Sequence, residues 1–84
     1  MRKRNAVGWY DKITDAQKAL AKSIARKALR QIKQIKGVYN GMLLHHTSMS
    51  AMSAGIVTNN GCIARGYKPV VAFAFHLVVD GWHR

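Results

Sequence analysis

Residues 14–36 read TDAQKALAKSIARKALRQIKQIK, and this stretch decides the architecture. Thr14 is followed three residues later by Gln17. This is the pattern of a capping box, in which the threonine hydroxyl accepts from the Gln17 amide and the glutamine side chain returns to the Thr14 amide. Asp15 falls in the first turn, where a carboxylate is stabilised by the positive end of a helix. We therefore expect a helix to begin at Thr14.

Apolar residues continue from this start with a mean step of about 3.6 residues, which is the period of an α-helix. They are Ile13, Ala16, Leu20, Ile24, Ala28, Ile32, Ile35, Tyr39 and Met42. Neither glycine nor proline interrupts the pattern before Gly37. We expect an amphipathic helix that continues to Met42, so that residues 14–42 form one cationic segment after a basic N-terminal segment, residues 1–13.

The polar side of this helix is strongly cationic. It carries Lys18, Lys22, Arg26, Lys27, Arg30 and Lys33. From Lys22 onward no acidic residue stands three or four positions away, and like charges at these spacings destabilise an isolated helix. A solvated face and a face that contacts anionic phospholipid, such as cardiolipin, or nucleic-acid phosphate are equally good explanations. Base recognition fits less well, because Gln31 and Gln34 are almost the only amides there and no aromatic residue is interleaved.

The positive charge is concentrated in the first half of the chain. Fourteen Lys and Arg against three Asp and Glu give the 84 residues a formal net charge of +11, and eleven of the basic residues precede Gly37. No charged residue occurs from Gly37 to Ala64. This asymmetry is typical of proteins that meet a nucleic-acid or membrane surface. The basic, acid-poor N-terminal part also resembles a mitochondrial targeting segment in composition.

Size and composition argue against an enzyme. A chain of 84 residues leaves hardly any room for an enclosed active-site cleft, and the single cysteine, Cys62, excludes an internal disulfide framework. His45 and His46 are adjacent, so on a helix their side chains point about 100° apart and cannot chelate one metal ion well. No catalytic serine, histidine and aspartate set and no phosphate-binding glycine loop is recognisable. We expect no catalytic residue, no metal and no cofactor.

The middle of the chain is uncharged. Residues 38–57 are long enough to cross the hydrocarbon core of a bilayer, about 30 Å, as a helix. Gly37 and Gly41, then Ala51 and Gly55, stand four apart, which is a spacing that lets membrane helices pack closely. Several histidine, serine and threonine residues make insertion marginal without protein neighbours. We expect a small-residue helix over residues 43–57, with a soluble helix packed on a partner as the alternative.

A loop over residues 58–66 is expected next, because Asn60 and Gly61 readily take positive φ. Residues 67–84 then form an apolar helix with an aromatic and basic tail, with Pro69 suited to its first turn. Residues 70–79 are short for a full crossing and could equally be a strand. The expected membrane-interface anchors are Tyr67, Lys68, Trp82 and Arg84. A buried terminal helix in a protein complex explains the same residues.

Three short motifs near the C-terminus carry a resemblance to a known family. They are Gly66-Tyr67-Lys68-Pro69, Phe75-His76-Leu77 and Trp82-His83-Arg84. They resemble fungal members of subunit f of the mitochondrial ATP synthase, one of the small accessory subunits of mitochondrial inner-membrane complexes. The resemblance implies a structural, non-catalytic role in holding subunits together at the membrane.

The combined prediction is an all-α chain with no independent globular core. A long basic amphipathic helix would be followed by one or two short apolar helices embedded in a membrane. The predicted function is a non-catalytic structural subunit that stabilises or assembles a complex of the mitochondrial inner membrane, with the ATP synthase membrane sector favoured. Its partners would be the other subunits and an anionic phospholipid such as cardiolipin. The alternative is a small basic RNA-binding protein of an organellar ribosome, with the same cationic side on RNA phosphates.

Overall fold

The first helix, α1, begins where the capping box predicts. The computed structural model describes residues 13–83, and α1 extends over Asp15–Ile32 with Thr14 as its N-cap. Thr14 Oγ1 accepts from the Gln17 amide at 3.0 Å, and Gln17 Oε1 accepts from the Thr14 amide at 3.0 Å. Both halves of the capping box are therefore present, and the predicted start of the helix is confirmed.

The end of α1 comes earlier than the apolar pattern predicts. Beyond Ile32 the next turn tightens, since its amides bond to carbonyls three residues back. Gly37 then has a φ of +71°, a left-handed conformation that glycine adopts readily, and the chain reverses. The single helix expected over residues 14–42 is therefore wrong. The apolar spacing continues past the reversal by coincidence, through a Tyr39 side chain that is 67% exposed.

The second helix, α2 (Asn40–Ser53), runs back against α1 and ends in a Schellman motif. The Ile56 amide donates to the Ala51 carbonyl at 3.1 Å, and the Gly55 amide donates to the Met52 carbonyl at 2.9 Å. Gly55 has the positive φ that this motif requires, +85°. The helix expected over residues 43–57 thus begins and ends a few residues too late.

The connection between α2 and α3 is a folded loop, residues 54–67, and the predicted loop over residues 58–66 lies within it. An isolated antiparallel bridge pairs Val57 with Ile63 at its base. Ile56 and Val57 are buried in a core cluster, and Ile63 packs against this cluster. The loop therefore covers one end of the apolar core and is more than a polar connection.

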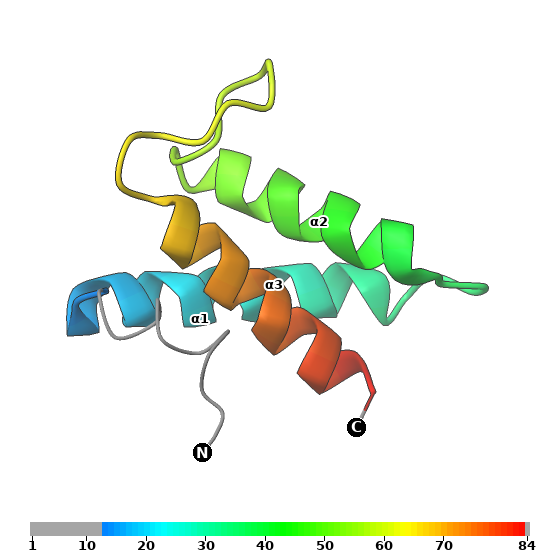
Figure 1. Ribbon diagram of the computed structural model, residues 1–84. Coiled ribbons are helices and arrows are strands. Elements are labelled where there is room, and N and C mark those ends of the chain that lie inside the picture. Colours follow the sequence, from blue (N-terminus) through cyan, green and yellow to red (C-terminus); the bar gives the residue numbers. More distant parts are fainter. Residues whose placement is uncertain (1–12, 84) are drawn as a thin grey trace.

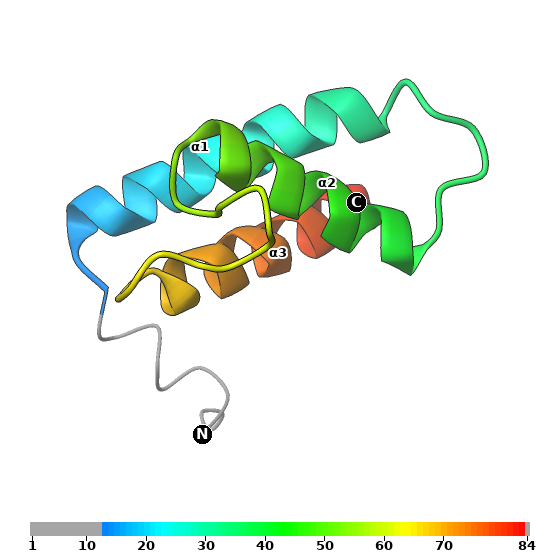
Figure 2. The same ribbon diagram turned by 90° about the horizontal axis from the view of Figure 1, so that it is seen from above.

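The third helix, α3 (Lys68–Trp82), carries Pro69 in its first turn. Residues 70–79 are helical throughout, which decides between the helix and the strand that the sequence left open. Its buried residues recur at helical spacing; they are Val70, Val71, Ala74 and Val78. Figures 1 and 2 show α1 and α3 running in the same general direction, with α2 running in the opposite direction.

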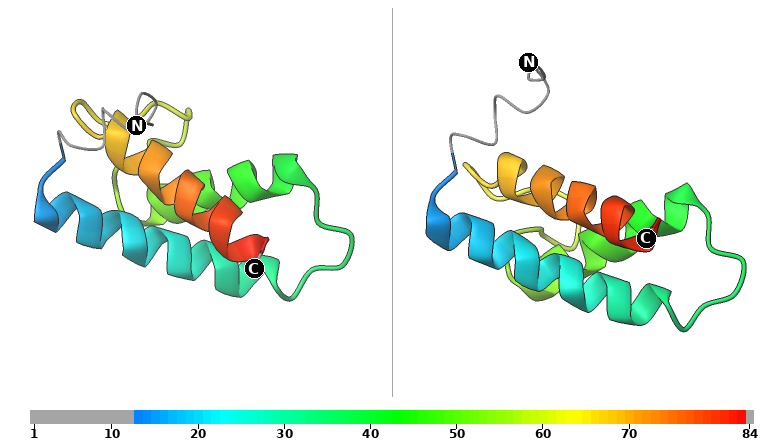
Figure 3. Two further views of the ribbon diagram at one scale, coloured as in Figure 1. Left: turned by 60° about the horizontal axis from the view of Figure 1, so that its bottom comes forward. Right: turned by 90° about the horizontal axis from the view of Figure 1, so that it is seen from below.

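α1 and α3 lie next to one another (Figure 3). Small side chains of both helices are buried in the core; Ala21, Ala25, Ala28 and Ala74 are each at most 3% exposed. Near the end of α3, a Cβ added to Gly81 would lie 2.7 Å from Leu29 Cδ1, so the Leu29 side chain would have to shift to admit it. Ile32, Leu43 and Val78 fill the space between the helices, and full burial of such a side chain contributes about 1.5–3 kcal/mol.

The chain therefore has a globular core of its own, and the prediction of a coreless, membrane-embedded chain is wrong. The radius of gyration is 12.6 Å, close to the value of about 12 Å expected for a compact domain of this length. α2 has 14 residues and α3 has 15, whereas about 20 are needed for a crossing. Across residues 13–83, no helix has both the length and the apolarity to cross a membrane. Many of the apolar residues assigned to lipid, among them Leu43, Val70 and Val78, instead pack in the core with the apolar side of α1, whereas Leu44, Met49 and Met52 are exposed.

Candidate anion-binding surface

One side of α1 is buried in the core and the opposite side is exposed and cationic. Its buried residues are Ala21, Ile24, Ala25, Ala28 and Ile32. We call the cationic face the three exposed cations of this helix, Lys22, Arg26 and Arg30, together with its exposed C-cap residue, Lys33. These positions follow one another at steps of four, four and three residues, so their side chains lie on one side of the helix over about 16 Å of its axis.

The cationic face contains a shallow hollow. Arg26, Arg30 and Lys33 surround it, Leu29 contributes to its wall, and its volume is about 230 Å³. Like charges at these spacings repel one another, and the sequence has no acidic residue between Ala16 and Val79. An anion placed among the three cations would relieve that repulsion. Guanidinium groups bind the oxygens of phosphate or carboxylate through two parallel hydrogen bonds, so the hollow is chemically suited to an oxyanion such as phosphate.

The two remaining cations of the predicted set lie at the edges of this face. Lys18 is half-buried near the start of α1. Lys27 is half-buried on the side toward α2, where its Nζ donates to Ser53 Oγ at 2.7 Å. Ser53 lies in the last turn of α2, where the helix dipole favours a cation. Lys27 thus has a structural role in holding α1 to α2, besides any contact with a ligand.

A groove separates α1 from α2 beside the cationic face. It has a volume of about 720 Å³ and is lined by Lys27, Arg30, Gln31, Gln34, Ile35, His46 and Met49. A hydrogen bond of 3.2 Å joins His46 Nδ1 to Gln31 Oε1 across it. The sequence pattern indicates no particular role for the two glutamines, and it does not indicate that His46 and Met49 lie beside α1. Only the packing of α2 on α1 brings these side chains together, so no local sequence signal marks the groove.

A smaller hollow of about 150 Å³ lies further along the same junction. Serine side chains from both helices line it, together with Lys27; they are Ser23, Ser50 and Ser53. Ser50 is only 3% exposed, and its Oγ has no hydrogen-bond partner among residues 13–83. The hollow is therefore polar, but the C-terminal end of α2 makes it less suited to an anion than the cationic face.

The small residues predicted to pack helices have a different use. Ala51 is fully buried and does pack in the core. Gly37 and Gly55 lie outside the helices, where each takes a positive φ. Gly41 is exposed in the first turn of α2. Two of the four residues, Gly37 and Gly55, are therefore found where the chain reverses, whereas Ala51 takes part in the helix packing.

The residues predicted as membrane-interface anchors are also placed differently. Tyr67 and Trp82 are half-buried and pack against the protein's own core. Lys68 is exposed at the start of α3. Arg84 lies outside the described residues, as does most of the predicted N-terminal segment 1–13.

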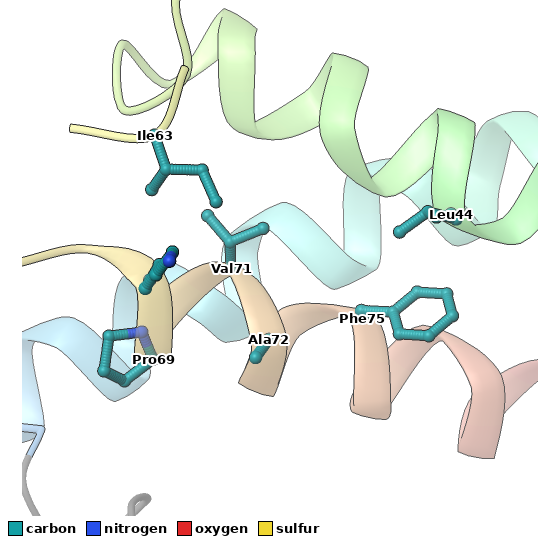
Figure 4. A pocket seen from close by; sticks show the side chains of 7 residues that line it. Leu44, Ile63, Pro69, Val71, Ala72 and Phe75 are labelled. Carbon is teal, nitrogen blue, oxygen red and sulfur yellow. The ribbon is translucent and has the colours of Figure 1, made fainter. Parts of the chain in front are cut away.

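An apolar groove lies between α2, α3 and the loop that joins them (Figure 4). Its volume is about 470 Å³, and its lining includes Leu44, Ile63, Val71 and Phe75. Figure 4 shows Leu44 and Phe75 facing one another across it. Lys68 is the one cation among its lining residues. This groove contains no residue of the cationic face, and it offers mainly hydrophobic contact.

The other residues considered for chemistry do not form a site in the described structure. The rings of His45 and His46 meet edge to face with their centroids 5.4 Å apart. Cys62 is a free, exposed thiol in the loop. Residues 13–83 contain no cluster of three histidine, cysteine or carboxylate side chains that could hold a metal ion. The cationic face and the α1–α2 groove are therefore the best candidates for function.

Neither a protein-family model, nor a curated protein, nor a solved structure matches this chain. The resemblance to subunit f of the mitochondrial ATP synthase thus stays a prediction from three short motifs. The geometry of the cationic face and of the grooves is therefore the basis for a proposal about function.

Proposed function

We propose that this protein binds nucleic acid through phosphate contacts of the cationic face. The observation that carries the proposal is the division of α1, which turns four cations outward while α2 and α3 bury its apolar side. A helix bound at a membrane surface inserts its apolar side among the lipids, and in α1 that side is occupied by the core. A phosphate backbone needs only the charge that α1 still presents.

The four cations have complementary roles in this proposal. Arg26 and Arg30 each offer a planar fork of donors that fits two oxygens of one phosphate, while Lys22 and Lys33 act as point charges at the two ends of the row. Lys22, Arg26 and Arg30 lie on α1 and Lys33 is its C-cap, so the spacing of their backbone positions is set before binding. Contacts of this kind fix the position of the strand but carry no information on base sequence.

The salt dependence of binding tests this proposal. Each phosphate contact contributes about 0.9 to the slope of log affinity against log salt for a duplex and about 0.7 for a single strand. Arg26→Gln and Lys33→Gln should each reduce the slope by about that amount, for every base sequence tested. Fluorescence anisotropy of a labelled RNA, titrated with the full chain between about 50 and 200 mM salt, gives the slope.

Two exposed cations elsewhere in the chain provide matched controls. Arg65→Gln, in the loop, and Lys68→Gln, at the start of α3, remove the same charge from other surfaces. They should leave the slope unchanged. An equal reduction in all four variants would mean attraction by net charge alone and would contradict the proposal. So would tight binding of cardiolipin vesicles by a chain that does not bind RNA.

The structural role in a mitochondrial inner-membrane complex stays a prediction. It would use the same cationic face on cardiolipin, so the vesicle measurement above bears on it as well. The mitochondrial location and the setting in an organellar ribosome also stay predictions. Co-migration of the chain with a defined complex on a native gel, identified by mass spectrometry, would test them.

A further inference from the structure

The α1–α2 groove opens directly beside the cationic face. Arg30 lines both the hollow on that face and the groove, so the two are continuous around one side chain. We propose that the groove holds one unpaired nucleobase of a single-stranded nucleic acid whose phosphates lie along the cationic face. This inference rests on the proposed function, because the phosphate contacts bring the strand to the groove.

The groove has the dimensions and the apolar surface that a base needs. Its volume of about 720 Å³ falls within the range typical of small-molecule sites, about 300–1,000 Å³. Ile35 on the α1 side and Met49 on α2 supply apolar contact, and Met49 is 45% exposed. A thioether makes favourable contacts with aromatic rings, and nucleobases present such rings on both faces.

The polar side chains of the groove suit the edge and the face of a base. The hydrogen bond between His46 Nδ1 and Gln31 Oε1 holds both side chains in place. Gln34 is exposed at the same groove and offers an amide, which can donate and accept at once. Histidine rings and arginine guanidinium planes are among the groups on which unpaired bases stack. Arg30 can therefore contact a phosphate on the cationic face, or stack its guanidinium plane on the base in the groove.

A duplex cannot use the groove in the same way. Its bases are paired and stacked, and turning one out costs a few kcal/mol. In double-stranded RNA the major groove is also too deep and narrow for side chains to reach the bases. Duplexes should therefore bind through the cationic face alone, whereas single strands gain the contact in the groove.

Met49→Ala and Gln34→Ala test this inference. Each should weaken binding of an unstructured single-stranded oligonucleotide by about two- to tenfold, in line with the contribution of one sulfur–aromatic contact or one hydrogen bond. Each should leave duplex affinity and the salt slope of both ligands unchanged. Met52→Ala is the matched control, because Met52 is also exposed on α2 but does not line the groove. Circular dichroism should show that all three variants fold.

An abasic strand of the same length provides a second, independent measurement. Wild-type protein should bind it at least as weakly as Met49→Ala binds the normal strand, because the abasic strand loses every base contact in the groove. Equal losses on single strand and duplex, or no loss on single strand, would overturn the inference. In either case the result for Arg26→Gln still decides the proposed function by itself. Wild-type protein that binds neither single strand nor duplex would overturn both.

Discussion

Thr47 and Ser50 place two hydroxyl groups on the buried side of α2, and their surroundings differ. Thr47 is fully buried, and its Oγ1 donates to the Leu43 carbonyl at 2.7 Å. Ser50 Oγ has no partner among the described residues. A buried hydroxyl that makes its hydrogen bond contributes modestly to stability, whereas one without a partner lowers it. The two residues should therefore respond in opposite ways to removal of the hydroxyl.

Ser50→Ala should raise the free energy of unfolding by about 1 kcal/mol, because it removes the cost of an unpaired polar group and favours the helix. Thr47→Val should lower it by about 0.5–1.5 kcal/mol through loss of its hydrogen bond. Urea unfolding followed by circular dichroism measures both. A loss of stability in Ser50→Ala would show that its hydroxyl makes a stabilising contact.

The site was only partly predictable at the scale of residues. A charged side chain must keep its head in water, so the outward position of Lys22, Arg26, Arg30 and Lys33 follows from helical spacing alone. The groove does not follow from it, because His46 and the residues beside it come from a different helix. Gln31 and Gln34 are visible in the sequence, but their role in the groove depends on the α2 side chains that pack beside them.

At the scale of elements, the Schellman motif decides where α2 ends. Gly55 is exposed, has a φ of +85°, and has open space where a Cβ would be. The effect of Gly55→Ala is therefore conformational, and we expect it to lower the free energy of unfolding by about 1–2 kcal/mol. Thermal unfolding followed by circular dichroism would measure this loss.

Gly41→Ala is the control for that change, since Gly41 lies within α2 and has no positive φ. The added Cβ would lie 2.8 Å from the Tyr39 ring, but this ring is exposed and free to shift. We expect Gly41→Ala to be neutral or stabilising, because alanine favours a helix. If Gly55→Ala proved as harmless as Gly41→Ala, the glycine would not be needed to end α2.

The elements themselves were predictable to different degrees. The capping box located the start of α1 correctly, because its hydrogen bonds involve neighbouring residues only. The end of α1 was missed, since apolar spacing continued through Tyr39 while the chain had already turned at Gly37. The choice of helix over strand for residues 70–79 needed tertiary context, because short apolar runs suit either.

At the scale of the whole molecule, the fold explains how a small and strongly basic chain can have a core. Alanines on α1 make room for α3, and the loop over residues 54–67 covers one end. From the pattern alone, the apolar residues of the second half were predicted to contact lipid or partner proteins. The pattern does not show that they pack against the apolar side of α1. Burial of the apolar side of α1 then leaves its positive charge as the most prominent surface feature.

Binding of nucleic acid by the cationic face is tested most directly by nuclear magnetic resonance of the ¹⁵N-labelled full chain. Addition of a single-stranded oligonucleotide should shift the signals of Lys22, Arg26, Arg30 and Lys33 most, together with those of the α1–α2 groove. Signals from the apolar groove near Leu44 and Phe75 should stay in place. Shifts concentrated at that apolar groove, or no shift at saturating oligonucleotide, would contradict the assignment.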